Sequence, residues 1–229
     1  MRQLVLFDID GTLLTAKGAG SRALEKTIRQ CYRIATLSVQ LPLDGKTDLM
    51  IIREALALAG SEGAFEGGLS EEFLAVYDHH LTEELHCCDH FRVLPGVTRL
   101  LNRLNRSEDF LSGLATGNVA AGARRKLSKG NLLPFFQFGG FGCDSESRTE
   151  IVRAAVVRGQ RILGGRFSGK SVVVGDTPRD ILHAREAGVK TVGVATGTFD
   201  LEQLKACSPD AVFPSLESTE EVMEALERI

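Results

Sequence analysis

Short apolar runs recur along the chain, and the segments between them carry apolar residues at helical spacing. The first run, at residues 4–7, reads Leu-Val-Leu-Phe. An unbroken apolar run of this kind is typical of a strand that is buried on both faces of a parallel sheet. By the same pattern we expect further strands at residues 110–115, 136–141, 171–174, 191–194 and 211–213.

Amphipathic segments separate these strands and predict helices. In the second half of the chain they cover residues 97–106, 119–129, 148–163, 178–188, 201–206 and a last stretch from 219. Pro178 suits the first turn of its helix, and Gly188 suits the end of the same helix. Because strands that alternate with helices form parallel sheets, the pattern predicts an α/β fold with a doubly wound parallel sheet.

Residues 16–91 follow a different pattern. Apolar residues at helical spacing predict helices at 21–32, 46–59 and 70–86, and this part of the chain has no convincing buried strand. We therefore expect an inserted all-helical cap domain at 16–91, with 1–15 and 92–229 forming the α/β core. An insertion of this kind is expected to act as a lid over a ligand site.

Composition and charge narrow the function classes. The chain has 229 residues, of which 43% are hydrophobic, enough for a core domain with an insertion. A net charge of -3 does not favour a nucleic-acid partner. The five cysteines have no C-x-x-C spacing, and no apolar stretch reaches the length of a membrane span. We therefore expect a cytoplasmic protein with no membrane partner.

Two carboxylates follow the first strand directly, in the segment Asp8-Ile9-Asp10-Gly11-Thr12. The carboxyl end of a parallel strand is where α/β proteins bind ligands. Asp8 and Asp10 would share a face if the strand continued, and Gly11 allows the chain to turn away there. Because close carboxylates repel each other, we expect either a cation between them or a proton on one of them.

Polar residues also follow two later strands. Thr116, Gly117 and Asn118 come between a strand and a helix, where a hydroxyl group and free N–H groups can bind an anion such as phosphate. Asp176 and Asp180 follow the strand at 171–174, one helical turn apart. Because the ends of parallel strands meet at one edge of a sheet, we expect all these groups to line one cleft.

The order and spacing of these motifs resemble the haloacid dehalogenase superfamily, in particular its phosphoglycolate phosphatase-like branch with a helical cap of the C1 type. The resemblance spans the whole chain. The segment from Asp8 to Thr12 resembles the first motif of the family, Thr116 the second, and Asp176 with Asp180 the fourth. Asp44-Gly45-Lys46-Thr47-Asp48 is similar to the substrate-facing turn of the cap in that branch, which makes Lys46 a candidate substrate contact.

The resemblance implies a Mg²⁺-dependent phosphatase that acts on a small phosphomonoester through an aspartyl phosphate. Asp8 would be the nucleophile, and Asp10 the general acid and then the base. The cation would be held by the Asp8 carboxylate, the Asp10 backbone carbonyl, Asp176 and Asp180. Phosphoryl oxygens would be bound by Thr116 and by N–H groups near Gly11, Thr12 and Gly117.

The third motif of the family, a lysine, is where the chain departs from the pattern. No lysine lies between Gly130 and Arg166, so the positive charge is expected from Arg148, which has the right spacing, or from Lys126. A planar guanidinium is not equivalent to the point charge of an ammonium group. The long, flexible side chain of Lys126 makes it the slightly favoured candidate.

Several alternatives remain open at the level of sequence. Asp10 disfavours dehalogenation, because a halide leaving group needs no proton. A phosphosugar mutase, a phosphonate hydrolase and a non-catalytic binding protein of the same fold remain possible, as do a monomer and a homodimer. A stretch rich in histidine and cysteine at residues 79–90 contains plausible zinc ligands, although no pair has the spacing of a zinc finger, and packing of the cap is the favoured interpretation.

Overall fold

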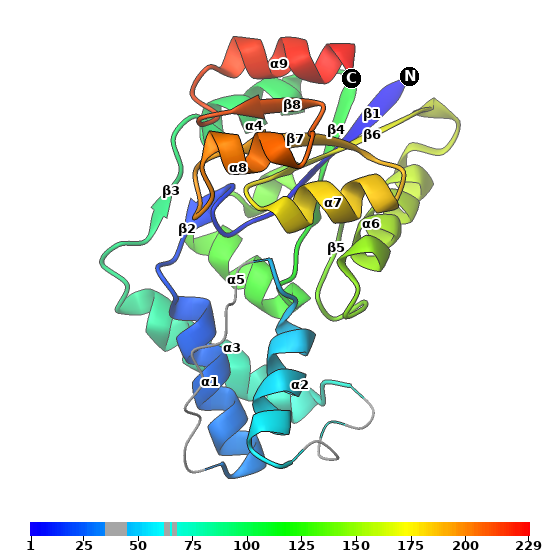
Figure 1. Cartoon of the computed structure of the whole chain (residues 1–229). Helices are drawn as coiled ribbons and strands as arrows, with labels where there is room; N and C mark the ends of the chain where they lie inside the picture. Colours follow the sequence, from blue (N-terminus) through cyan, green and yellow to red (C-terminus); the bar gives the residue numbers. More distant parts are fainter. Residues whose placement is uncertain (35–44, 62–64, 66–67) are drawn as a thin grey trace.

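A six-stranded parallel sheet forms the centre of the computed structural model, which describes residues 1–34, 45–61, 65 and 68–229. The strand order is β5-β4-β1-β6-β7-β8 (Figure 1). The strands are β1 (Arg2–Phe7), β4 (Phe110–Ala115), β5 (Gly139–Gly140), β6 (Phe167–Gly175), β7 (Lys190–Val194) and β8 (Ala211–Phe213). The order reverses beside β1, so the chain has the doubly wound topology that places ligands at the carboxyl ends of the central strands.

Helices cover both faces of this sheet because the side chains of β1 alternate between two apolar clusters. Leu4 and Leu6 pack toward one cluster, whereas Val5 and Phe7 pack toward the other. The core helices are α4 (Val97–Arg106), α5 (Ala120–Lys129), α6 (Arg148–Leu163), α7 (Pro178–Glu186), α8 (Leu201–Ala206) and α9 (Thr219–Arg228). The expected α/β fold is confirmed.

The inserted segment forms a helical cap below the carboxyl edge of the sheet (Figure 1). Its helices are α1 (Ala19–Tyr32), α2 (Asp48–Leu58) and α3 (Glu71–His86). Helix α3 packs against α1 and also against α5 of the core. The cap therefore rests on the helix that follows the motif at Thr116.

Two short strands, β2 (Leu14–Thr15) and β3 (Arg92–Val93), form an antiparallel ribbon that leads into and out of the cap. The sequence did not predict this ribbon, because two residues are too few to show a pattern. Nor did the expected strand at 136–141 form in full. A 3-10 turn occupies Leu133–Phe135, and only Gly139–Gly140 pairs with β4.

The boundaries of other elements shift by a few residues. Strand β6 begins at Phe167, four residues before the apolar run, because Phe167 pairs with Arg2. Helix α2 begins at Asp48 because the Thr47 side chain accepts a hydrogen bond from the Met50 N–H at 3.2 Å and caps the helix. Within the described residues, no helix is both long and apolar enough to cross a membrane.

Candidate active site

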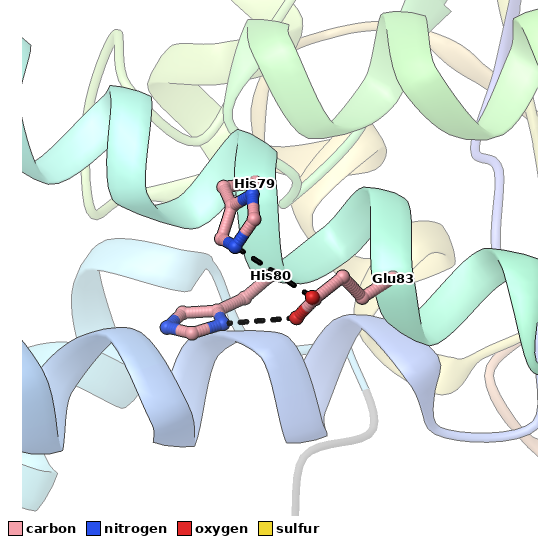
Figure 2. Close-up of side chains that lie close together, drawn as sticks. All are labelled: His79, His80 and Glu83. Atoms are coloured by element: carbon pink, nitrogen blue, oxygen red, sulfur yellow. Dashed lines mark ion pairs between the residues drawn. The ribbon is translucent and has the colours of Figure 1, made fainter.

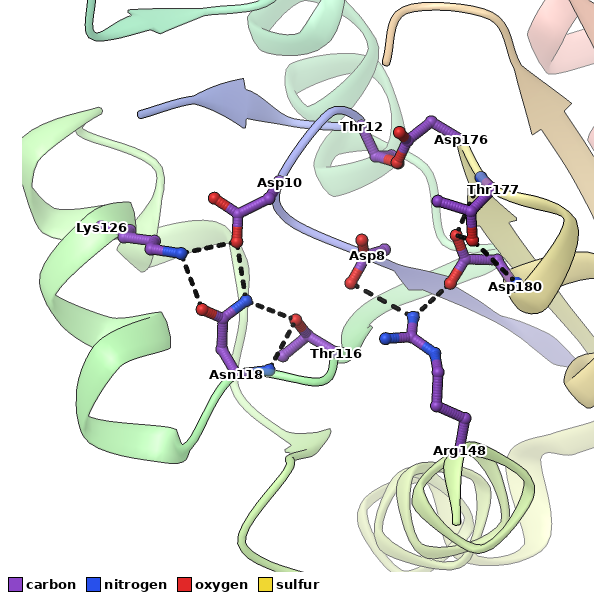
Figure 3. A network of polar contacts seen from close by, with 10 residues as sticks. All are labelled: Asp8, Asp10, Thr12, Thr116, Asn118, Lys126, Arg148, Asp176, Thr177 and Asp180. Atoms are coloured by element: carbon purple, nitrogen blue, oxygen red, sulfur yellow. Dashed lines mark hydrogen bonds and ion pairs between the residues drawn. The ribbon is translucent and has the colours of Figure 1, made fainter. Parts of the chain in front are cut away.

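The loop after β1 holds its two carboxylates in different surroundings. The Asp8 side chain is buried, with 9% of its surface exposed, whereas 41% of the Asp10 side chain is exposed. Asp8 faces Arg148, and Asp10 faces Lys126 (Figure 3). Gly11 allows the loop to turn at a φ of +87°, and a Cβ atom there would lie 2.2 Å from Asp176 Oδ2. The close approach of the loop to Asp176 therefore requires glycine.

Three buried carboxylates, from Asp8, Asp176 and Asp180, meet at the carboxyl edge of β1 and β6. One oxygen from each lies within 4.8 Å of the others. Burial and the neighbouring Asp180 charge raise the pKa of Asp8 to about 7, although Arg148 acts in the opposite direction. Burial and the charges of Asp180 and Asp8 also raise the pKa of Asp176 well above its usual range.

Three carboxylates close together offer the hard oxygen ligands that Mg²⁺ prefers. Thr12 and Thr177 hold two of the carboxylates in place. Thr12 Oγ1 donates to Asp176 Oδ1 at 2.8 Å, and Thr177 Oγ1 donates to Asp180 Oδ2 at 2.7 Å. The carboxylate of Asp10 is not in this group.

Arg148, at the start of α6, lies between two of the three carboxylates. Its Nη2 atom is 3.4 Å from Asp8 Oδ1 and donates a hydrogen bond to Asp180 Oδ1. Burial alone would lower the pKa of this guanidinium, but the charges of Asp180 and Asp8 outweigh burial and raise it. Of the two candidates for the third-motif charge, Arg148 is the one that lies beside Asp8, although Lys126 was slightly favoured.

Lys126 contacts Asp10, the second carboxylate of the loop after β1. Only 5% of its side chain is exposed, and its Nζ atom donates to Asp10 Oδ2 at 2.6 Å and to Asn118 Oδ1 at 2.7 Å. The length of the side chain lets it return from the second turn of α5 to the strand end. Arg148 and Lys126 both reach the site, but each neutralises a different aspartate.

Thr116 and Asn118 connect these two halves of the site. The Asn118 amide Nδ2 donates to Asp10 Oδ2 and to Thr116 Oγ1, both at 2.9 Å. A hydrogen bond from Thr116 favours the charged form of Asp8 and so opposes the rise of its pKa. Figure 3 shows Thr116 at the strand end, between the two aspartates.

The N–H groups expected to bind phosphoryl oxygens near Gly11 and Thr12 have partners within the loop. The Gly11 N–H donates to Leu14 O at 2.9 Å, and the Thr12 N–H donates to Ile9 O at 3.3 Å. The Thr12 side chain is buried against Asp176. The N–H groups of both residues are thus used within the loop, and Gly11 and Gly117 both lie at the wall of the cavity.

A cavity of about 410 Å³ joins the core site to the cap. Asp8, Asp10 and Asp176 line it from the core, and Lys46 lines it from the cap. The Lys46 Nζ atom lies 2.5 Å from Glu54 Oε2. Further cap residues on the wall are Gly18, Gly20, Ser21, Leu24, Gly45, Asp48 and Ile51. Asp44, part of the expected cap turn, lies outside the described residues.

The histidine-rich stretch lies apart from this cavity, on α3. His79 Nε2 and His80 Nδ1 each lie 3.6 Å from a different carboxylate oxygen of Glu83 (Figure 2). His80 Nε2 also contacts Gln30 of α1 at 2.9 Å. Among the described residues, the cysteines and the other histidines of the stretch do not join this group.

Asp48, which the sequence analysis named only as part of the expected substrate-facing turn, reaches from the cap to the core. Its carboxylate accepts a hydrogen bond from the Val119 N–H at 2.8 Å. Burial raises the pKa of Asp48 to about 6, although the charge of Lys126 opposes this. The contact joins segments 71 residues apart in the chain, so no local pattern in the sequence predicts it.

Comparison with known proteins agrees with this arrangement. The family model for haloacid dehalogenase-like hydrolases matches residues 5–194. A phosphoglycolate phosphatase of Agrobacterium fabrum is 27% identical over 212 residues, which cover 91% of this chain and 87% of that protein. A phosphoglycolate phosphatase of Pseudomonas putida is 26% identical over 226 residues, covering 93% and 77%.

Solved structures share the fold over the whole chain. A haloacid dehalogenase-like family protein from Streptococcus pneumoniae superimposes with a TM-score of 0.62 at 17% identity, covering 97% of this chain and 98% of that one. A candidate β-phosphoglucomutase from Bacteroides vulgatus gives a TM-score of 0.64 at 21% identity, covering 99% and 89%. The family match covers most of the chain, including the strand ends that carry the site. The chain belongs to the haloacid dehalogenase-like hydrolase family.

Proposed function

We propose that the chain is a Mg²⁺-dependent phosphatase that hydrolyses a small, phosphoglycolate-like phosphomonoester through an aspartyl phosphate. The observation that carries this proposal is the difference in surroundings between two aspartates two residues apart. Asp8 is buried beside Arg148 and two further carboxylates, whereas Asp10 is turned toward Lys126 and is partly exposed. Different surroundings suit a nucleophile and an acid–base group, respectively.

In the first step an Asp8 carboxylate oxygen forms a bond to phosphorus while the bond from phosphorus to the leaving oxygen breaks. Asp10 gives its proton to that leaving oxygen. Water then attacks the phosphorus of the aspartyl phosphate, the bond to Asp8 breaks, and Asp10 takes the proton from the water. The products are the alcohol and inorganic phosphate, and both aspartates return to their starting states.

Several groups would hold the phosphoryl group during these steps. Asp8, Asp176 and Asp180, with the backbone carbonyl of Asp10, would hold Mg²⁺, which when bound would offset the negative charge of the nucleophile and the phosphate. Arg148, Thr116 and the N–H of Gly117 would bind phosphoryl oxygens. Lys46 from the cap and Asn118 from the core would border the remainder of the substrate.

The size of the cavity limits the leaving group. A volume of about 410 Å³ accommodates a small metabolite. Its walls combine polar groups, such as Lys46 and Ser21, with the apolar Leu24 and Ile51. Because two relatives are phosphoglycolate phosphatases, phosphoglycolate belongs at the head of any substrate panel.

The test is phosphate release from a panel of small phosphomonoesters, with Mg²⁺ and with the metal removed by chelation. We expect Mg²⁺-dependent release by the wild type and none by Asp8→Asn. Isomerisation of a sugar phosphate without net phosphate release would instead assign a mutase. Absence of turnover on the whole panel would contradict the proposed function.

A further inference from the structure

The turn before α2 in the cap lies directly on the loop between β4 and α5 in the core. The Asp48 N–H donates to Gly117 O at 2.9 Å, and the Asp48 Oδ2 atom accepts from the Val119 N–H at 2.8 Å. A Cβ atom on Gly117 would lie 2.4 Å from Lys46 O. The two backbones therefore touch, and no side chain fits between them.

Among the described residues, the core supplies no acidic side chain of its own to the N-terminal end of α5. The N-cap residue of α5, Val119, makes no side-chain capping bond, and the first turn of α5 contains no acidic residue. A helix start attracts negative charge, because its N–H groups are unpaired and its dipole is positive there. Asp48 supplies that charge from the cap.

The residue between the two contacts of Asp48 is Asn118, which reaches Asp10. Asn118 Nδ2 donates to Asp10 Oδ2 at 2.9 Å, and its Oδ1 atom accepts from Lys126 Nζ. Lys126 binds the same Asp10 oxygen at 2.6 Å. The cap turn thus holds the backbone on either side of Asn118, and the Asn118 side chain in turn hydrogen-bonds to the proposed acid–base group.

We infer that Asp48 is a positioning residue: by holding the loop of residues 117–119, it places Asn118 so that Asp10 points at the leaving oxygen when the cap is docked. This inference rests on the proposed function. Without the cap turn, the Val119 N–H loses its Asp48 acceptor and Asn118 loses the contacts on either side of it. We therefore expect Asp10 to be correctly oriented only while the cap covers the site.

The test compares two cap carboxylates that both bind α5. Asp78 on α3 bonds to Arg125 in the middle of α5, where Arg125 Nε donates to Asp78 Oδ1 at 2.9 Å, and within the described residues no hydrogen bond joins Asp78 to residues 117–119. Asp78→Ala is therefore the matched control for Asp48→Ala. Asp48→Asn keeps an oxygen that can accept from Val119 and serves as the conservative variant.

The readout uses two substrates that differ in their need for an acid. An alkyl phosphate has a poor leaving group that must be protonated, whereas p-nitrophenolate leaves without a proton. We expect Asp48→Ala to lower kcat/KM for the alkyl phosphate about tenfold more than for p-nitrophenyl phosphate. Asp48→Asn should restore most of the loss, and Asp78→Ala should leave the ratio unchanged.

Equal losses on both substrates would overturn the inference, because a merely structural role lowers both alike. Hydrogen exchange gives a second readout that needs no turnover. Asp48→Ala should accelerate exchange in residues 117–123 and Asp78→Ala should not; unchanged exchange in Asp48→Ala would also overturn the inference. A wild type that releases no phosphate would count against the proposed function, while the exchange result would still decide the role of Asp48 in holding the loop.

Discussion

At the scale of single residues, the site depends on a guanidinium where the family pattern has a lysine. Arg148 Nη2 reaches Asp180 and lies 3.4 Å from Asp8. The planar guanidinium of an arginine carries several N–H donors and can contact both carboxylates at once. The side chain of a lysine is shorter and ends in a single ammonium group, which cannot make the same two contacts.

The substitution Arg148→Lys tests this difference. We expect kcat/KM to fall about ten- to a hundredfold, because charge-assisted hydrogen bonds are lost beside the nucleophile. Arg153→Lys is the control on the same helix, since Arg153 is half exposed and pairs with Glu150. A fully active Arg148→Lys variant would show that the fork geometry is not needed.

Metal affinity should depend on pH because of Asp8. Its pKa of about 7 means that, below this pH, a proton occupies the group that the cation needs. We expect Mg²⁺ affinity to rise as the pH is raised from about 6 to about 8, by roughly tenfold, and then to level off. Calorimetric titration measures this directly.

The control for the pH experiment is Asp8→Asn, which removes the Asp8 carboxyl group and leaves that of Asp176. Its weaker Mg²⁺ binding should change less over the same pH range. An affinity that does not vary with pH in the wild type would contradict the assignment of Asp8 as a metal ligand.

At the scale of elements, tight loops at strand ends bring the site together. Gly11 and Gly188 both have positive φ angles, +87° and +75°, but a Cβ atom on Gly188 would meet nothing within 4 Å. Gly188→Ala therefore measures the backbone cost alone, about 1 kcal/mol.

Gly11→Ala adds a collision with the Asp176 carboxylate, which a Cβ atom would approach to 2.2 Å. We expect activity to fall about a hundredfold, because the loop that carries Asp10 must move away from Asp176. Phosphate release by folded protein compares the two variants. Equal activity of Gly11→Ala and Gly188→Ala would contradict the close approach of loop and carboxylate.

The sequence predicted the elements whose patterns are local. Apolar runs identified β1, β4 and β7, and topology alone brought three strand ends to one edge. The ribbon of β2 and β3 escaped prediction because pairing with a distant segment, and not local pattern, makes it. The strand expected at residues 136–141 forms only at Gly139–Gly140, where the chain pairs with β4.

The same distinction applies to the site. Asp8, Asp176 and Asp180 could be grouped from their strand ends, since a parallel sheet fixes where such ends meet. The division between Arg148 and Lys126 depends on how α5 and α6 pack, and the role of Asp48 depends on the cap resting on α5. Such contacts between elements leave no periodic signal in the sequence.

At the scale of the whole molecule, the cap and the core share one cavity. The cap contributes Lys46 and Asp48 to its wall, and the core contributes the carboxylates. A site built from both parts can close around a small substrate and exclude bulk water during the first step. At this scale the proposed function requires that the phosphoryl group of the substrate is transferred to Asp8 before water releases it.

The most direct test is to trap that intermediate. The enzyme would be quenched with acid during turnover of its best substrate, reduced with borohydride, and digested for mass spectrometry. We predict reduction at Asp8 in the wild type and none in Asp8→Asn. Turnover with no trapped residue, or with reduction at Asp10 in place of Asp8, would contradict the account.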